Sequence, residues 1–305
     1  MAENRWIVYQ RERFPLAGHV PLVAAFSCSA VSFSALLRDA GGPGSRSTIV
    51  AFASSLLFFL QLRIADEFKD ANEDARYRPY RPVPRGLVTL DELRTIAFIA
   101  IAAQAALAVW LDASLLILLV PIWIYLALMQ REFFAARWLR ARPIAYMATH
   151  MAIVPLIDFY ATACDWWVAG VSHPPLTLSW FLLVSLGNGF VIELGRKIRA
   201  PIDEEPGVET YSALWGTSGA ARAWLAALTC AGSCGLIAAR SIDMTGPLAI
   251  ALAGLLGACA LTARRFVIAP AAFGGKRFEA LSWLWTVSMY LTLGLVPLAW
   301  RTLRA

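Results

Sequence analysis

Nine long apolar stretches, separated by shorter charged segments, constrain this chain more than any other feature of its sequence. Each runs for roughly 17 to 23 residues, and an α-helix rising 1.5 Å per residue needs about 20 to cross a hydrocarbon core of about 30 Å. Only 16% of the chain is charged, whereas a soluble domain carries about a quarter. We therefore predict an all-α, polytopic membrane protein in which residues 1–305 form a single integral-membrane domain. About nine transmembrane helices are expected, near residues 16–38, 48–65, 95–111, 113–129, 144–163, 176–192, 220–238, 246–263 and 280–300.

The basic residues predict how these helices are oriented, because cytoplasmic loops of membrane proteins are enriched in Lys and Arg. With the N-terminus inside and nine helices alternating in direction, 22 of the 27 Lys and Arg residues fall on the inside. The five outside are Arg38, Arg46, Arg240, Arg301 and Arg304. The net charge of +6 then reflects loops beside anionic lipid, or an anionic substrate, and needs no nucleic-acid partner.

A row of carboxylates follows the second apolar stretch: Asp66, Asp70, Glu73 and Asp74. If the helix continues through them, all four lie within roughly 100° of one another on one face. Like charges at such spacings repel, so the row makes sense if divalent cations bind to it. Oxygen ligands suit Mg²⁺, which typically takes one or two carboxylates together with waters and phosphate oxygens. The alternative interpretation is a solvated helix end.

The next segment, residues 76–86, is rich in arginine and proline. Its prolines fix an extended, turning backbone, and guanidinium groups such as those of Arg78 and Arg81 bind phosphate oxygens bidentately. Acids on a helix with arginines just beyond it suggest a clamp for Mg²⁺ and a diphosphate, although the segment is equally compatible with a structured basic loop.

These motifs resemble those of the UbiA superfamily of intramembrane prenyltransferases over nearly the whole chain. Asp66-xxx-Asp70-xxx-Asp74 followed by RPVPRG at 81–86 is similar to the family patterns N-D-x-x-D-x-x-x-D and R-P-x-P-x-G. Tyr125-xxxx-Gln130-Arg131 resembles Y-x-x-x-x-K-R, and residues 207–216 resemble the segment that follows the family's second acidic motif.

The resemblance implies a helical bundle around a central lateral cavity, with Mg²⁺ as cofactor at its cytoplasmic end. An isoprenyl diphosphate would bind there, and a lipophilic acceptor would capture the prenyl group within the bilayer. The implied metal ligands are Asp66, Asp70, Asp74 and Asp203, and the implied catalytic residues are Asp66, Asp70, Asp74, Arg131 and Arg199. The diphosphate would be bound by Lys69, Arg78, Arg81, Arg131, Arg196, Lys197 and Arg199.

Three positions depart from the family pattern. Asp66 replaces an asparagine, Gln130 replaces a lysine, and the second acidic motif becomes Arg199-xxx-Asp203. We interpret the change at the second motif as direct binding of the diphosphate by Arg196, Lys197 and Arg199. Asp203, or Glu193 on the preceding helix, would then supply one metal ligand. The alternative is that these cations only anchor the loop at the membrane surface.

Ionisable and polar groups within the spans normally face the bundle interior, because exposing them to lipid is unfavourable. His150 is a candidate for hydrogen bonding to an acceptor or accepting its proton, or else a simple interhelical contact. We expect an acceptor pocket formed by Tyr125, Tyr146, His150 and Asn188. Aromatic faces stabilise a carbocation, but interfacial Tyr and Trp are also ordinary membrane anchors.

The sequence thus predicts an enzyme that uses Mg²⁺ to transfer an isoprenyl group from its diphosphate to a lipophilic acceptor. We expect this acceptor to be aromatic. A terpene cyclase of the same superfamily would ionise the same diphosphate and capture the cation intramolecularly. Two further alternatives are a phosphoribosyl transferase that acts on a polyprenyl phosphate and a transporter. The active site is expected to face the cytoplasm.

Overall fold

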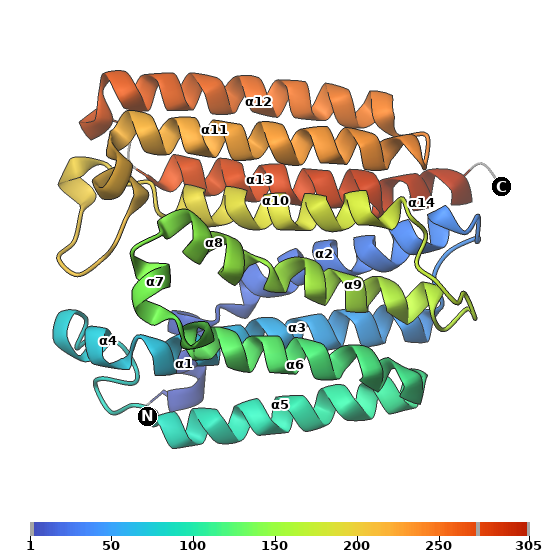
Figure 1. The fold of residues 1–305 in the computed structure, drawn as a ribbon, viewed down its shortest axis with the longest axis horizontal. Coiled ribbons are helices and arrows are strands. Elements are labelled where there is room, and N and C mark those ends of the chain that lie inside the picture. The colour runs from blue at the N-terminus through green and yellow to red at the C-terminus, as the bar shows by residue number, and fades with distance from the viewer. Residues whose placement is uncertain (1–2, 273–274, 304–305) are drawn as a thin grey trace.

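The computed structural model describes residues 3–272 and 275–303, and these are helical with connecting turns and loops (Figure 1). Arg304, which the sequence analysis assigns to the outside, lies beyond the described residues. The α-helices are α1 Arg5–Arg13, α2 Leu16–Leu37, α3 Ser45–Lys69, α4 Ala71–Tyr77, α5 Leu90–Leu111, α6 Leu116–Gln130, α7 Ala136–Arg140, α8 Pro143–Met151, α9 Ile153–Trp166, α10 Leu178–Arg196, α11 Tyr211–Arg240, α12 Thr245–Ile268, α13 Lys276–Leu293 and α14 Leu295–Thr302.

Within the described residues, nine helical segments are long and apolar enough to cross a membrane, which confirms the predicted number. Three of them are interrupted. α8 and α9 form one span with a break at Ala152, α13 and α14 form another with a break at Gly294, and α11 has a kink at Gly216. Several spans extend beyond the predicted apolar stretches, for example to Lys69 in α3 and from Tyr211 in α11. Many of the extra residues are polar, and they continue the helices past the apolar stretches from which the prediction was made.

Small residues let the helices approach one another closely, as is common in membrane bundles. A Cβ atom added at Gly187 of α10 would lie 2.8 Å from the Cβ of Ala231 in α11. One added at Gly195 would lie 3.0 Å from the carbonyl oxygen of Phe278 in α13. The long helices therefore run side by side along the long axis of the molecule (Figure 1).

Charged and polar side chains link the spans far from the predicted site. Arg38, directly after α2, donates to both carboxylate oxygens of Asp165 in α9, at 3.0 and 2.7 Å, and the hydroxyl of Ser34 adds a third hydrogen bond. Asp158 of α9 is fully buried and accepts hydrogen bonds from Ser185 of α10 and Tyr290 of α13. Both carboxylates thus connect neighbouring helices.

The end of the bundle opposite the Arg38 and Asp165 pair carries most of the short helices. In Figure 1, α1, α4 and α7 lie at the left, together with the loop between α10 and α11. The C-terminal part of α3 and the N-terminal parts of α5 and α8 reach the same end. The long helices therefore present their polar extensions together, and the carboxylate row of the sequence lies among them.

The break at Gly294 provides a test of this packing. An alanine Cβ there would lie 2.4 Å from the Cα of Ser29, so backbone would have to move, whereas one at Gly254 meets nothing within 4 Å. We expect Gly294→Ala to lower the free energy of unfolding by about 1–3 kcal/mol. The matched Gly254→Ala change should be tolerated. Thermal unfolding of both variants in detergent measures the difference, and equal stability would refute the close contact.

Candidate active site

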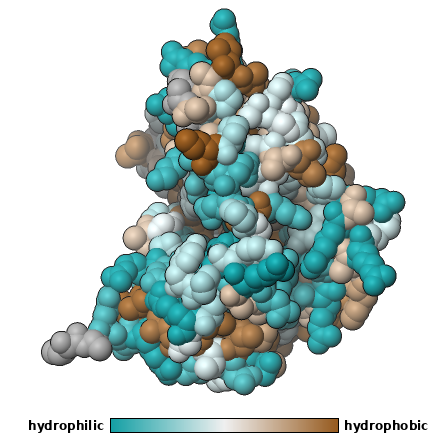
Figure 2. Space-filling model, turned by 90° about the vertical axis from the view of Figure 1, so that its left-hand side faces the viewer, coloured by the Kyte–Doolittle hydropathy of each residue, from teal (hydrophilic) through white to brown (hydrophobic). Residues whose placement is uncertain are grey.

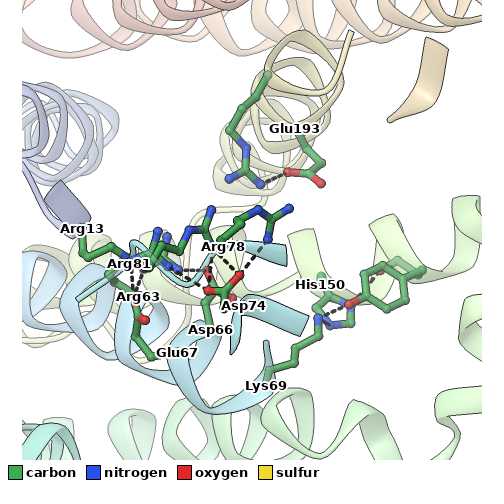
Figure 3. A network of polar contacts seen from close by, with 12 residues as sticks. Arg13, Arg63, Asp66, Glu67, Lys69, Asp74, Arg78, Arg81, His150 and Glu193 are labelled. Atoms are coloured by element: carbon green, nitrogen blue, oxygen red, sulfur yellow. Dashed lines mark hydrogen bonds and ion pairs between the residues drawn. The ribbon is translucent and has the colours of Figure 1, made fainter. Parts of the chain in front are cut away.

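The end of the molecule that carries α4 and α7 is largely hydrophilic. Figure 2 shows polar side chains over most of this face, surrounding a depression near its centre. The side chains of the predicted site come from the C-terminal ends of α3 and α10, from α4 and the arginine-rich loop after it, and from α8 (Figure 3). Residues distant in the sequence are thus brought to one surface.

The carboxylate row does not lie on one straight helix as predicted. α3 ends at Lys69, Asp70 adopts a non-helical conformation (φ −91°, ψ 3°), and α4 starts at Ala71 in a new direction. Glu73 points to solvent, whereas Asp74 is buried. The prediction of a single acidic face was therefore wrong beyond Asp70, because the helix bends there.

Asp74 lies between two arginines. Its side chain is 2% exposed, and its oxygens accept hydrogen bonds from Arg78 at 2.7 Å and from Arg81 at 2.6 Å. Burial favours the protonated form, but the hydrogen bonds and charges of Arg81 and Arg78 outweigh it, so the pKa of Asp74 is lowered. Asp74 thereby fixes the arginine-rich loop against α4, and its oxygens are occupied by guanidinium groups.

A second buried carboxylate, Glu67, was not among the predicted site residues. Its side chain is 1% exposed; the Nε atom of Arg13 donates to it at 2.5 Å, and the Nε atom of Arg63 lies 3.5 Å away. The sequence did carry a signal for Glu67, because the family pattern has an acidic residue directly after its first position. Arg13 and Arg63 had no such signal. Four arginines thus surround two buried carboxylates (Figure 3).

Asp66 and Asp70 have the properties expected of Mg²⁺ ligands. The side chain of Asp66 is 48% exposed, and its only described ion pair is a long one, 3.6 Å to Arg63. Burial, followed by the negative charge of Asp66, raises the pKa of Asp70. Two neighbouring carboxylates that repel each other fit a cation that needs only one or two protein ligands.

The structure does not gather the four predicted metal ligands at one point. Among residues 3–272 and 275–303, His, Cys, Asp and Glu side chains nowhere form a group of three or more that could hold a metal. Asp203 is exposed in a short 3-10 turn, Pro201–Asp203. The arrangement therefore fits a metal on Asp66 and Asp70 whose remaining ligands are waters and substrate oxygens.

The second motif presents cations, as its sequence suggests. Glu193 is held by Arg196 at 2.7 Å and by Lys197 at 2.8 Å. The side chain of Arg196 remains 54% exposed. Arg199 pairs instead with Glu205 at 3.0 Å, within the loop. The exposed guanidinium group of Arg196 is thus available at the C-terminal end of α10.

Lys69 joins the first motif to the predicted acceptor residues. Its ammonium group contacts the hydroxyl of Tyr146, lies 3.4 Å from Nε2 of His150, and is 3.9 Å from Oε1 of Glu132. Nδ1 of His150 lies 2.9 Å from the carbonyl oxygen of Tyr146. Because a carbonyl only accepts, this contact assigns the proton to Nδ1 and leaves the Nε2 lone pair facing Lys69.

The loop after α6 contains an unusual turn that places Glu132. Three consecutive residues other than glycine, Glu132, Phe133 and Phe134, have φ values of 47°, 53° and 57°. This left-handed conformation costs roughly 1–2 kcal/mol per residue. It buries Glu132, whose Oε1 also lies 3.3 Å from Arg140 and whose Oε2 has no hydrogen-bond partner. Such strain is concentrated at functional sites, and no glycine in the sequence indicated it.

The remaining predicted residues lie around this cluster or away from it. Tyr125 donates to the carbonyl oxygen of Thr149 at 2.7 Å and so ties α6 to α8. Arg131 is exposed at the C-terminal end of α6, directly before the left-handed turn. Asn188 is fully buried, and both polar atoms of its side chain lack a hydrogen-bond partner. The rings of Tyr146 and His150 are stacked, with their centroids 4.0 Å apart.

Fold and site together define a multi-pass membrane protein with an acidic and arginine-rich centre at one end of its bundle. The chain belongs to the UbiA prenyltransferase family, whose sequence profile matches residues 24–287. A search of curated protein sequences finds no match.

Solved structures of other proteins share the fold, among them the following three. A UbiA homologue from Aeropyrum pernix K1, solved without ligand, has a TM-score of 0.62 and 15% identity, with 90% of this chain and 95% of that one covered. A digeranylgeranylglyceryl phosphate synthase has a TM-score of 0.56 and 12% identity, covering 99% and 100%. A UbiA homologue from Archaeoglobus fulgidus, bound to DMAPP and Mg²⁺, has a TM-score of 0.53 and 11% identity, covering 93% and 98%.

Metal binding tests the division of the acidic residues. We expect Asp66→Asn and Asp70→Asn each to weaken Mn²⁺ binding roughly tenfold or more, because each removes a charged ligand. Asp74→Asn should have a much smaller effect, since arginines occupy its oxygens. Asp91→Asn is a matched control, because Asp91 is an exposed aspartate paired with Arg94 on α5. Electron paramagnetic resonance titration measures the affinity, and an equal loss with Asp74→Asn would contradict the assignment.

Proposed function

We propose that this protein transfers an isoprenyl group, with Mg²⁺, from an isoprenyl diphosphate to a lipophilic acceptor, with an aromatic acceptor as the first expectation. The N-terminus and the polar end of the bundle would face the cytoplasm. The observation that carries the proposal is the excess of arginines over buried carboxylates beside the Asp66 and Asp70 pair. Family membership supports it, as does the DMAPP and Mg²⁺ bound to the Archaeoglobus fulgidus homologue.

The first part of the reaction is departure of the diphosphate. The allylic C–O bond breaks and its electron pair leaves with the diphosphate, so negative charge increases on the leaving group. Arg78 and Arg81 are pre-positioned by Asp74, and Arg196 is available from α10. Fixed cations aimed at developing charge are usually the largest catalytic contribution. Mg²⁺ bound by Asp66 and Asp70 would neutralise further charge on the phosphate oxygens.

Two adjoining apolar grooves are suited to the isoprenyl chain. The larger, of about 670 Å³, lies between α2, α13 and α14, and the smaller, of about 270 Å³, lies between α2 and α13. Pro21 and Val287 line both. Gly18, which lines the smaller groove, is five residues after Arg13 of the charged site. We propose that the isoprenyl chain lies along these two grooves, with its diphosphate end toward α1.

Capture of the cation requires an acceptor with an available electron pair and a group that takes its proton. The acceptor forms the new bond to the prenyl carbon, and an aromatic acceptor then loses a ring proton. The Nε2 lone pair of His150 and the carboxylate of Glu132 are the candidate proton acceptors, and Lys69 lies near both. The rings of Tyr146 and Phe133 next to His150 offer faces that stabilise a cation by about 0.5–2 kcal/mol each.

The decisive experiment supplies substrates to the protein in lipid vesicles. We expect incubation with Mg²⁺, prenyl diphosphates of several lengths and aromatic acceptors to give prenylated acceptor, detected by mass spectrometry. The product should be absent with EDTA and reduced at least about 100-fold in Asp70→Asn, because an electrostatic contribution to the transition state is lost. Asp91→Asn should retain wild-type turnover.

Omitting the acceptor separates the alternatives. A cyclised hydrocarbon or alcohol formed from the diphosphate alone would assign a terpene cyclase instead. Absence of any product from every diphosphate, with and without acceptors, would reject prenyl transfer.

A further inference from the structure

The N-terminal helix α1 lies before residues 24–287, the part of the chain that the family profile matches, yet its last residue lies in the charged site. The side chain of Arg13 is only 8% exposed. Its Nε donates to Glu67 at 2.5 Å, and its Nη2 lies 3.8 Å from the carboxylate of Asp74 (Figure 3). The site described above is therefore completed by a helix outside the matched segment.

Contacts along its length fix α1 against the elements that form the site. Its N-terminus is capped by Asn4, whose side chain accepts from the backbone N–H of Trp6 at 2.9 Å. Tyr9 is buried in a small apolar cluster with Ile64 of α3, Val88 and Leu93. These contacts give the C-terminal end of α1 a defined position over α3 and α5.

Two ion pairs across α1 add to this anchoring. Arg5 pairs with Glu92 of α5 at 2.6 Å, and Glu12 pairs with Arg85 of the arginine-rich loop at 3.0 Å. The second pair joins α1 directly to the loop that carries Arg78 and Arg81. The helix is thus connected to both sides of the charged site, and its position is coupled to that of the loop.

Arg13 also retains an unused donor. Its Nη2 is buried and has no hydrogen-bond partner, although Nε is satisfied by Glu67. An unpaired buried donor is unfavourable, and phosphate oxygens are the acceptors that guanidinium groups match best. The surrounding charges agree, because Arg13, Arg63, Arg78 and Arg81 outnumber by one the acids with which they pair, Glu67, Asp74 and Asp66. An anion would balance the cluster.

We propose that α1 is part of the active site, and that Arg13 binds the diphosphate group of the substrate through Nη2 while Glu67 holds its guanidinium in place. This inference rests on the proposed function for the identity of the diphosphate. Glu67 is then a positioning residue, and the substrate's head group is enclosed between α1 on one side and the arginine-rich loop on the other.

The test measures binding of inorganic diphosphate with Mg²⁺ to the full chain in detergent by calorimetry. We expect Arg13→Gln to weaken binding roughly 10- to 100-fold, the effect of losing one charged hydrogen bond. Arg13→Lys should restore it only in part, because lysine keeps the charge but lacks the planar fork. The matched control is Arg11→Gln on the same helix, since Arg11 is exposed and pairs with Glu3. It should bind like the wild type.

A double variant keeps the test decisive if Arg13→Gln unfolds because Glu67 is left buried and unpaired. Arg13→Gln combined with Glu67→Gln removes both charges, so we expect it to fold and still bind diphosphate weakly. Wild-type affinity in the double variant would mean that Arg13 only neutralises Glu67, and the inference would be overturned. A wild-type protein that does not bind inorganic diphosphate would also overturn it.

Turnover distinguishes this inference from the proposed function. With a prenyl diphosphate, Arg13→Gln should raise the KM for that substrate more than it lowers kcat, whereas a purely structural role would lower the amount of folded enzyme and leave KM unchanged. Binding of diphosphate that depends on Arg13 supports the inference even if no prenyl product forms. An unchanged KM and affinity in Arg13→Gln would overturn it even if the protein is an active prenyltransferase.

Discussion

The arrangement of the polar end depends on two buried carboxylates, Glu67 and Asp74, that are each neutralised by arginines. Burying a charge is tolerated only when partners replace the lost water. Here these partners come from α1, α3 and the arginine-rich loop. The ion pairs that neutralise the two carboxylates therefore also hold these three elements together. With these two acids paired, Asp66 keeps only a long ion pair with Arg63, and Asp70 has no ion pair among the described residues. Pairing one set of acids thus leaves the other set suited to a metal.

Most of the fold could be predicted from the sequence because the bilayer imposes a simple rule on helix length and polarity. The nine apolar stretches correspond to nine spans in the described residues, and even interrupted spans such as α8 and α9 were recognised as one. Helix ends were less predictable, since a polar helix extending past the hydrocarbon leaves no hydropathy signal. The extension of α3 to Lys69 is an example, and it is in such extensions that the site residues lie.

The sequence proposed the residues of the candidate site, and the structure shows how they are arranged. Their spacing placed Asp66, Asp70 and Asp74 on one straight helix, but the bend at Asp70 directs Asp74 toward arginines instead. The left-handed turn that buries Glu132 could not be predicted, because none of its residues is a glycine. Arg13 was missed for a different reason: it is distant in sequence from the motif, and only tertiary packing of α1 brings it to Glu67. Local spacing carries information about neighbours on one helix and little about partners from another.

The paired Arg38 and Asp165 at the far end of the bundle make the two ends chemically unequal. There, one guanidinium meets one carboxylate through two hydrogen bonds, and Ser34 contributes a third. That pairing is electrically neutral, while the polar end has guanidinium groups in excess. If the protein binds an isoprenyl diphosphate as proposed, the charged head group would be attracted to the arginine-rich end of the bundle. The hydrocarbon tail would then extend toward the end where Arg38 and Asp165 neutralise each other.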